Sequence, residues 1–92
     1  MKAIWKNTII AESEKTVVVE KNHYFPPDSV KMEYLTKSGN TYTCAWKGVC
    51  DYYDITVGKD VNKDAAWMYP TPTEPAKEIK GHFAFSHGVE II

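Results

Sequence analysis

The sequence predicts an all-β domain, a barrel-like or bent double sheet, with one or two short helical turns. Segments rich in β-branched and aromatic residues recur along the chain, and short turns of glycine, proline, asparagine and charged residues separate them. Of the 92 residues, 43% are hydrophobic and 13% are aromatic, which is enough for one small core. We therefore expect residues 1–92 to form a single domain.

The first third of the chain predicts three strands. Residues 3–5 and 8–11 are mainly apolar and β-branched or aromatic, and the polar pair at 6–7 between them favours a tight hairpin. A second polar turn at 12–15 precedes the β-branched run at 16–20, which has a strong preference for strand. We expect these three strands to pair in sequence order as a meander.

The segment 22–29 interrupts this pattern with two consecutive prolines, which lack backbone donors and exclude a central strand. We expect a rigid loop here. Asp28 or Ser29 is suited to cap a short helical turn over residues 30–35. The polar, glycine-containing segment 37–40 predicts a further turn.

A central hairpin is predicted from strands at 41–45 and 49–57, joined by a three-residue loop at 46–48 that ends in glycine. In this register Cys44 and Cys50 face each other across the two strands.

The last third predicts a strand over residues 65–69, which a series of prolines ends. Residues 74–79 favour one helical turn before a glycine. Segments 82–85 and 89–91 then predict a closing hairpin.

Composition and charge argue against several classes of function. All eleven basic residues are lysine and the net charge is −1, so we expect no nucleic-acid partner. The sequence also lacks the glycine-rich loops that bind nucleotide phosphates. No run of eighteen apolar residues exists, so we expect no membrane span. The first residues lack the apolar core of a signal peptide, which predicts a cytoplasmic protein with reduced thiols. The cysteine and histidine spacing matches no metal motif, and we expect neither a metal nor another cofactor.

Several segments occur in a distinctive order and spacing: Asn22-His23-Tyr24-Phe25-Pro26, Cys44-Ala45-Trp46-Lys47-Gly48, Tyr52-Tyr53, Ala65-Ala66-Trp67-Met68-Tyr69-Pro70, and Ile79-Lys80-Gly81 with Ala84-Phe85. On these segments the chain resembles the family called domain of unknown function 427 over essentially its whole length.

The resemblance implies a β-tent, in which two antiparallel sheets meet at an angle over a pocket. The family is sometimes labelled nucleotidyltransferase-like, without a reaction that can be transferred. Some β-tent relatives hold a structural zinc on paired Cys-x-x-Cys motifs, which this chain lacks. It also departs from the family pattern at Ala45, where proline is usual, and at Cys50, where a small residue without a thiol is usual.

The candidate site lies around the central hairpin and its neighbouring strands. Trp67 and Tyr69 alternate to one face of a strand, and aromatic rings of this kind form walls for flat or cationic ligands. A lysine at the hairpin tip is placed to neutralise an anionic group. We predict a pocket for a small molecule, lined by Cys44, Trp46, Lys47, Trp67 and Tyr69, with Tyr24 and Tyr53 as further candidates.

Other interpretations of the same residues stay open. A free cysteine is usually a small buried apolar residue, single aromatic rings usually pack in cores, and an exposed lysine is usually solvated. One alternative function is an enzyme that uses Cys44 or Lys47 as its nucleophile. Another is a protein-interaction module that uses a free sheet edge, and we expect a monomer or a weak dimer.

Overall fold

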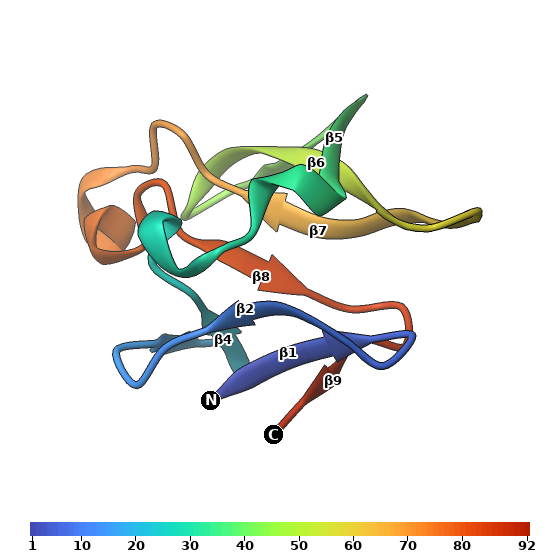
Figure 1. The fold of residues 1–92 in the computed structure, drawn as a ribbon. Helices are drawn as coiled ribbons and strands as arrows, with labels where there is room; N and C mark the ends of the chain where they lie inside the picture. The colour runs from blue at the N-terminus through green and yellow to red at the C-terminus, as the bar shows by residue number, and fades with distance from the viewer.

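A computed structural model, which describes all 92 residues, shows three antiparallel sheets and three short 3₁₀ turns (Figure 1). The predicted all-β class is confirmed, but there are three sheets where two were expected, and none closes into a barrel. The strands are β1 (Lys2–Trp5), β2 (Thr8–Glu12), β3 (Val17–Val19), β4 (Asn22–Tyr24), β5 (Leu35–Cys44), β6 (Gly48–Val57), β7 (Asp60–Met68), β8 (Phe83–Phe85) and β9 (Glu90–Ile91). The 3₁₀ turns are η1 (Pro27–Ser29), η2 (Met32–Tyr34) and η3 (Glu74–Ile79).

The sheets have the strand orders β2-β1-β9, β3-β4 and β5-β6-β7-β8. Figure 1 shows the three-stranded sheet lying below the four-stranded one. The β3–β4 hairpin joins the larger sheet through Phe25 and Phe83, whose backbone N–H groups each donate to the other's carbonyl, at 2.7 and 2.9 Å. None of the helical segments has the length and apolar character needed to cross a membrane.

The predicted first hairpin is confirmed: β1 pairs with β2, and Lys6 and Asn7 form its turn with φ of 51° and 57°. The predicted meander is wrong, because β3 pairs with β4 and not with β2. Glu20 and Lys21 also have positive φ, 52° and 68°. This second tight turn folds the chain back before the prolines, so a short strand forms where a loop was expected.

The helical turn expected over residues 30–35 is present as the short turn η2, and a second turn, η1, precedes it. Val30 lies between them and forms an isolated bridge with Ala11. The Lys31 N–H donates to the Ile10 carbonyl at 2.8 Å, which fixes this segment to β2.

The predicted central hairpin is confirmed, since β5 pairs with β6, but its predicted register is wrong. The segment 37–40 is not a turn but lies within β5, where the pairing with β6 is interrupted. The loop spans residues 45–47, so Cys44 pairs with Gly48, and Cys50 pairs with Tyr42. The two cysteines are therefore diagonal neighbours rather than opposite each other, and both are free thiols.

At the C-terminal end, β7 contains most of the predicted strand, and η3 covers the predicted helical turn. The predicted closing hairpin is wrong. Strand β8 pairs with β7, whereas β9 crosses to the other sheet and pairs with β1. After the turn at residues 86–88 the chain leaves the large sheet, so β8 and β9 have no common partner.

Two apolar cores cover the opposite faces of the large sheet. Alternation along the strands separates them: Tyr53 and Phe83 face one core, and Tyr52 and Ala84 face the other. The first core consists of Ala3, Ile10, Ala11, Phe25, Val30, Leu35, Ile55, Ala65, Ala66, Phe83 and Phe85. The second core consists of Tyr24, Cys50, Tyr69, Ala76, Ile79 and Ala84.

Candidate functional site

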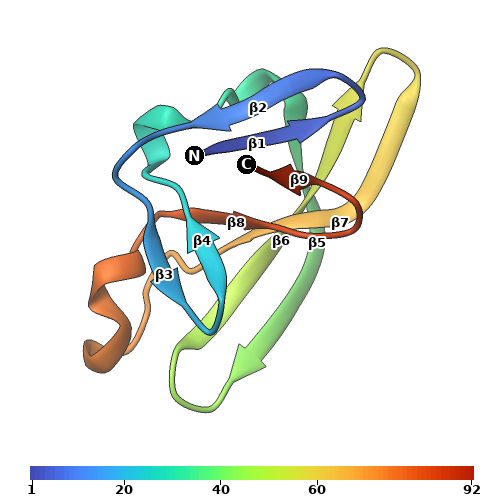
Figure 2. The same ribbon diagram turned by 90° about the horizontal axis from the view of Figure 1, so that it is seen from below.

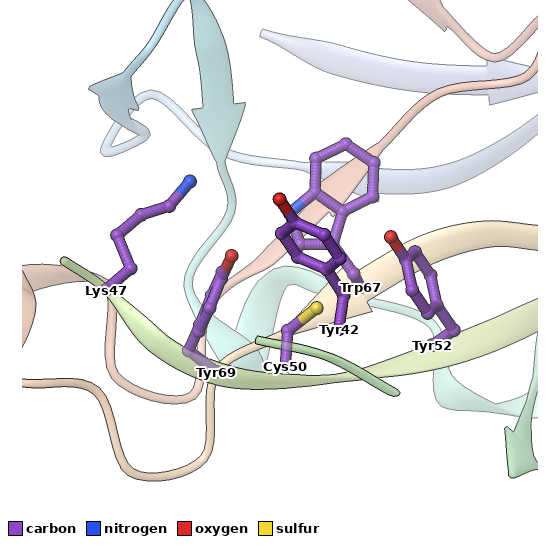
Figure 3. A pocket seen from close by; sticks show the side chains of 6 residues that line it. All are labelled: Tyr42, Lys47, Cys50, Tyr52, Trp67 and Tyr69. Carbon is purple, nitrogen blue, oxygen red and sulfur yellow. The ribbon is translucent and has the colours of Figure 1, made fainter. Parts of the chain in front are cut away.

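A cavity of about 150 Å³ lies on the second-core face of the large sheet. Four of the six side chains around it are aromatic. Figure 3 shows that the amine of Lys47 and the three tyrosine hydroxyls point to the same side. The lining side chains are Tyr42, Lys47, Cys50, Tyr52, Trp67 and Tyr69.

Strand pairing positions the walls of this aromatic pocket. Tyr42 is opposite Cys50 in the β5–β6 pair, and Tyr52 is opposite Trp67 in the β6–β7 pair. The rings of Tyr52 and Trp67 meet edge to face, with centroids 6.5 Å apart. Tyr69 follows the end of β7 on the same face, so three neighbouring strands supply one continuous surface.

Lys47 comes from the loop between β5 and β6, and only 6% of its surface is exposed. Thr73 holds this loop, because its N–H donates to the Lys47 carbonyl at 3.0 Å and its hydroxyl donates to the Trp46 carbonyl. The Lys47 ammonium lies 5.2 Å from the centroid of the Tyr69 ring, within range of a cation–π interaction. The lysine is therefore fixed at the pocket wall.

Glu20 binds this lysine from outside the sheet. One carboxylate oxygen accepts a hydrogen bond from Lys47 Nζ, and the other accepts from Trp46 Nε1 at 3.4 Å. The Glu20 side chain is 51% exposed, unlike its partner. In Figure 2 the tip of the β3–β4 hairpin, which carries Glu20, lies beside the turn between β5 and β6.

Tyr24 lies behind the pocket. It is fully buried, and its hydroxyl accepts a hydrogen bond from Trp67 Nε1 at 3.1 Å. This contact joins β4 to β7 and fixes the indole that forms the back wall.

The surroundings set the charge of the pocket. Burial lowers the pKa of the Lys47 ammonium, but the hydrogen bond to Glu20 and the nearby phenols of Tyr24 and Tyr69 outweigh it, and the pKa ends above its ordinary value. Burial raises the pKa of the Cys50 thiol and of the Tyr69 phenol. At neutral pH the pocket therefore presents an ammonium at Lys47, a neutral thiol at Cys50 and a neutral phenol at Tyr69.

Three of the seven predicted site residues line the pocket: Lys47, Trp67 and Tyr69. Trp46 is exposed at the rim, where the centroid of its ring lies 5.8 Å from the Lys47 ammonium. Half-buried Cys44 packs against the second core.

Tyr24 supports the pocket from behind rather than projecting into it. The placement of Tyr53 was wrong. Its ring packs in the first core against Phe83, with centroids 5.1 Å apart, because odd positions of β6 face away from the pocket.

The predicted set of site residues omits Tyr42, Cys50 and Tyr52, which line the pocket, and Glu20, which is the partner of the lysine. Side chains of a strand alternate between its two faces, so Cys50 and Tyr52 share one face. This alternation points to Tyr52 as a wall residue. Whether Tyr42 faces the pocket depends on the exact register of the β5–β6 hairpin. Glu20 is 27 residues from Lys47, and no local pattern points to it.

The structure brings together no group of three or more histidine, cysteine, aspartate or glutamate side chains that could hold a metal ion.

A family model described as domain of unknown function (DUF427) matches residues 1–92. The chain belongs to this family. A search among curated proteins finds none that matches. The DUF427 description assigns no reaction, so the function of this DUF427 domain is inferred from its own residues.

Proposed function

We propose that this DUF427 domain binds a small ring-containing molecule in the aromatic pocket. The observation that carries the proposal is a single open cavity lined by four aromatic side chains and one buried lysine. Ligand sites are commonly apolar and aromatic, with a few polar groups that fix the orientation of the ligand.

The volume of the cavity limits the size of the ligand. A cavity of about 150 Å³ accommodates a benzene-sized ring. Pockets for drug-sized ligands are larger, roughly 300 Å³ or more. We therefore assign the pocket to one ring, with any further part of the ligand outside it.

The charge of the wall favours a neutral or anionic ligand. Lys47 is the one formally charged residue among the six that line the pocket, and no carboxylate lines it. A cationic ligand would meet the lysine as a like charge. The tyrosine hydroxyls supply hydrogen-bonding groups for a phenol or a similar polar ring.

Binding is favoured over nucleophilic catalysis by the protonation of the pocket. A lysine nucleophile needs a free lone pair, and the raised pKa keeps Lys47 as an ammonium. The predicted cysteine nucleophile, Cys44, does not line the pocket; the cysteine that does, Cys50, would have to react as the thiolate, and burial raises the pKa of its thiol.

The proposal is tested by titrating the ¹⁵N-labelled protein with phenol and following the indole N–H signals by NMR. Trp67 lines the pocket, Trp46 stands at its rim, and Trp5 packs in the first core. We expect saturable shifts at Trp67 and none at Trp5. Substituting Cys50→Leu, which adds volume inside the pocket, is expected to abolish the response, whereas Val61→Leu at an exposed position of β7 should preserve it. Equal shifts at Trp67 and Trp5, or no shift at millimolar phenol, would contradict the proposal.

A further inference from the structure

The rim of the pocket already holds a carboxylate. Lys47 Nζ and Trp46 Nε1 donate to the two different oxygens of Glu20. Two donors directed at the two oxygens of one carboxylate form a recognition site for that group, and the charged donor makes the interaction stronger than a neutral hydrogen bond. The structure thus shows what these donors bind.

The two sides of this contact differ in how firmly they are held. The donors belong to the loop at residues 45–47, which Thr73 fixes through both carbonyls. Lys47 is almost fully buried. The carboxylate comes from a two-residue turn with positive φ, and its side chain is half exposed. Glu20 is therefore the removable half, and it can leave the site without any change in the sheet.

The same ammonium also borders the aromatic pocket. It lies 5.2 Å from the centroid of the Tyr69 ring, and both residues line the cavity. A ring that enters the pocket therefore places its substituent near the donors that Glu20 now occupies.

We propose that the ligand is an aromatic carboxylate whose carboxyl group replaces Glu20 on Lys47 and Trp46 while its ring fills the pocket. This inference rests on the proposed function and adds the chemical class of the ligand and a regulatory role for Glu20. In the free protein Glu20 acts as an internal competitor, tethered at a high effective concentration. Binding of the ligand releases the β3–β4 hairpin tip from the β5–β6 turn.

The expected gain in affinity depends on how often Lys47 and Trp46 are free of Glu20. When a competent state is only a fraction of the population, the apparent affinity falls by that fraction. If Glu20 occupies the donors about nine-tenths of the time, its removal strengthens carboxylate binding about tenfold. A neutral ring that does not use the donors gains nothing from the removal.

The test compares benzoate with phenol on the wild-type domain and on Glu20→Ala, by NMR titration of the Trp46 and Trp67 indole signals. We expect benzoate to bind Glu20→Ala about tenfold more tightly than wild type, and phenol to change by less than about twofold. Lys47→Met in the Glu20→Ala background should abolish the gain. Glu14→Ala changes the net charge equally at an exposed site outside the pocket and should leave both affinities unchanged. Glu20→Gln, which keeps the side-chain length, serves as a second variant if Glu20→Ala does not fold.

The outcomes separate the two proposals. If phenol binds but benzoate gains nothing in either Glu20 variant, the aromatic-carboxylate inference is wrong and the pocket still binds rings. If Glu14→Ala strengthens benzoate as much as Glu20→Ala does, the effect is a general one of charge and the inference is also wrong. If neither compound shifts Trp67 in any variant, both proposals fail.

Discussion

The hydrogen bond between Trp67 and Tyr24 connects the β3–β4 hairpin to the back wall of the pocket, and Tyr24→Phe tests what it contributes. The substitution removes the hydroxyl that accepts from Trp67 Nε1 and keeps the ring of a fully buried residue. We expect the free energy of unfolding to fall by about 1 kcal/mol.

The magnitude follows from the burial of each partner. A neutral hydrogen bond contributes roughly 0.5–1.5 kcal/mol net, and a donor sealed from water costs about 1–3 kcal/mol when its acceptor is removed. Trp67 is only half-buried and borders an open pocket, so water can approach its N–H group. Because water can reach this donor, we expect the loss in the free energy of unfolding to lie near the middle of the range of roughly 0.5–1.5 kcal/mol. Trp67→Phe should cost more, since it also removes part of a packed indole and leaves the Tyr24 hydroxyl buried without a partner.

The assay is urea unfolding followed by circular dichroism for the wild type, both single variants and the double variant. The double-mutant cycle should show a coupling of about 1 kcal/mol between the two positions. Tyr42→Phe is the matched control, because this tyrosine is 55% exposed and should lose almost nothing. A Tyr24→Phe variant as stable as the Tyr42→Phe control, or two strictly additive single variants, would refute the reasoning.

Three further predictions concern the two faces of the large sheet, the charge of Glu20 and the two thiols. Tyr53→Ala should lower the free energy of unfolding by about 2–4 kcal/mol, because its ring packs in the first core. Tyr42→Ala, at an exposed position, should lower it by less than about 1 kcal/mol. Urea unfolding measures both, and equal losses would show that the faces of the sheet are misassigned. Hydrogen bonds from the lysine and from the rim indole lower the pKa of Glu20, so its stabilising contribution is present above the ordinary carboxyl pKa and is lost as the pH falls through the lowered value. Wild type should therefore lose more thermal stability than Glu20→Gln on acidification below about pH 4.5, and parallel losses would contradict this. Iodoacetamide at neutral pH should modify half-buried Cys44 before Cys50, whose thiol is buried and has a raised pKa; peptide mass spectrometry reads the order, and faster modification of Cys50 would be the contrary result.

Local patterns in the sequence predicted the parts of the fold that depend on neighbouring residues. The polar pair Lys6-Asn7 between two mainly apolar segments identified the first hairpin, and Asn7 is of a residue type that tolerates the positive φ that a two-residue turn requires. Alternation along β7 placed Trp67 and Tyr69 on one face, and both line the pocket.

The errors arose where pairing depends on distant parts of the chain. The β5–β6 loop is displaced by one residue from its predicted place, which puts Tyr42 rather than Cys44 opposite Cys50. A polar segment with a glycine resembles a turn, but at residues 37–40 it is an irregularity inside a long strand. The contact between Glu20 and Lys47 joins the tips of two hairpins from different sheets, and only the assembled fold brings them together.

The division of consecutive residues between two cores limits how the length of this chain can vary. On β6, Tyr52 belongs to the pocket and Tyr53 to the first core. Inserting or deleting one residue there would reverse every later side chain of the strand and exchange a pocket wall for a core face. The turn at Gly58-Lys59 is different, because a side-chain carbon added at Gly58 meets no atom within 4 Å. An inserted label or affinity tag therefore belongs at this turn, while the strands on either side must keep their residue count.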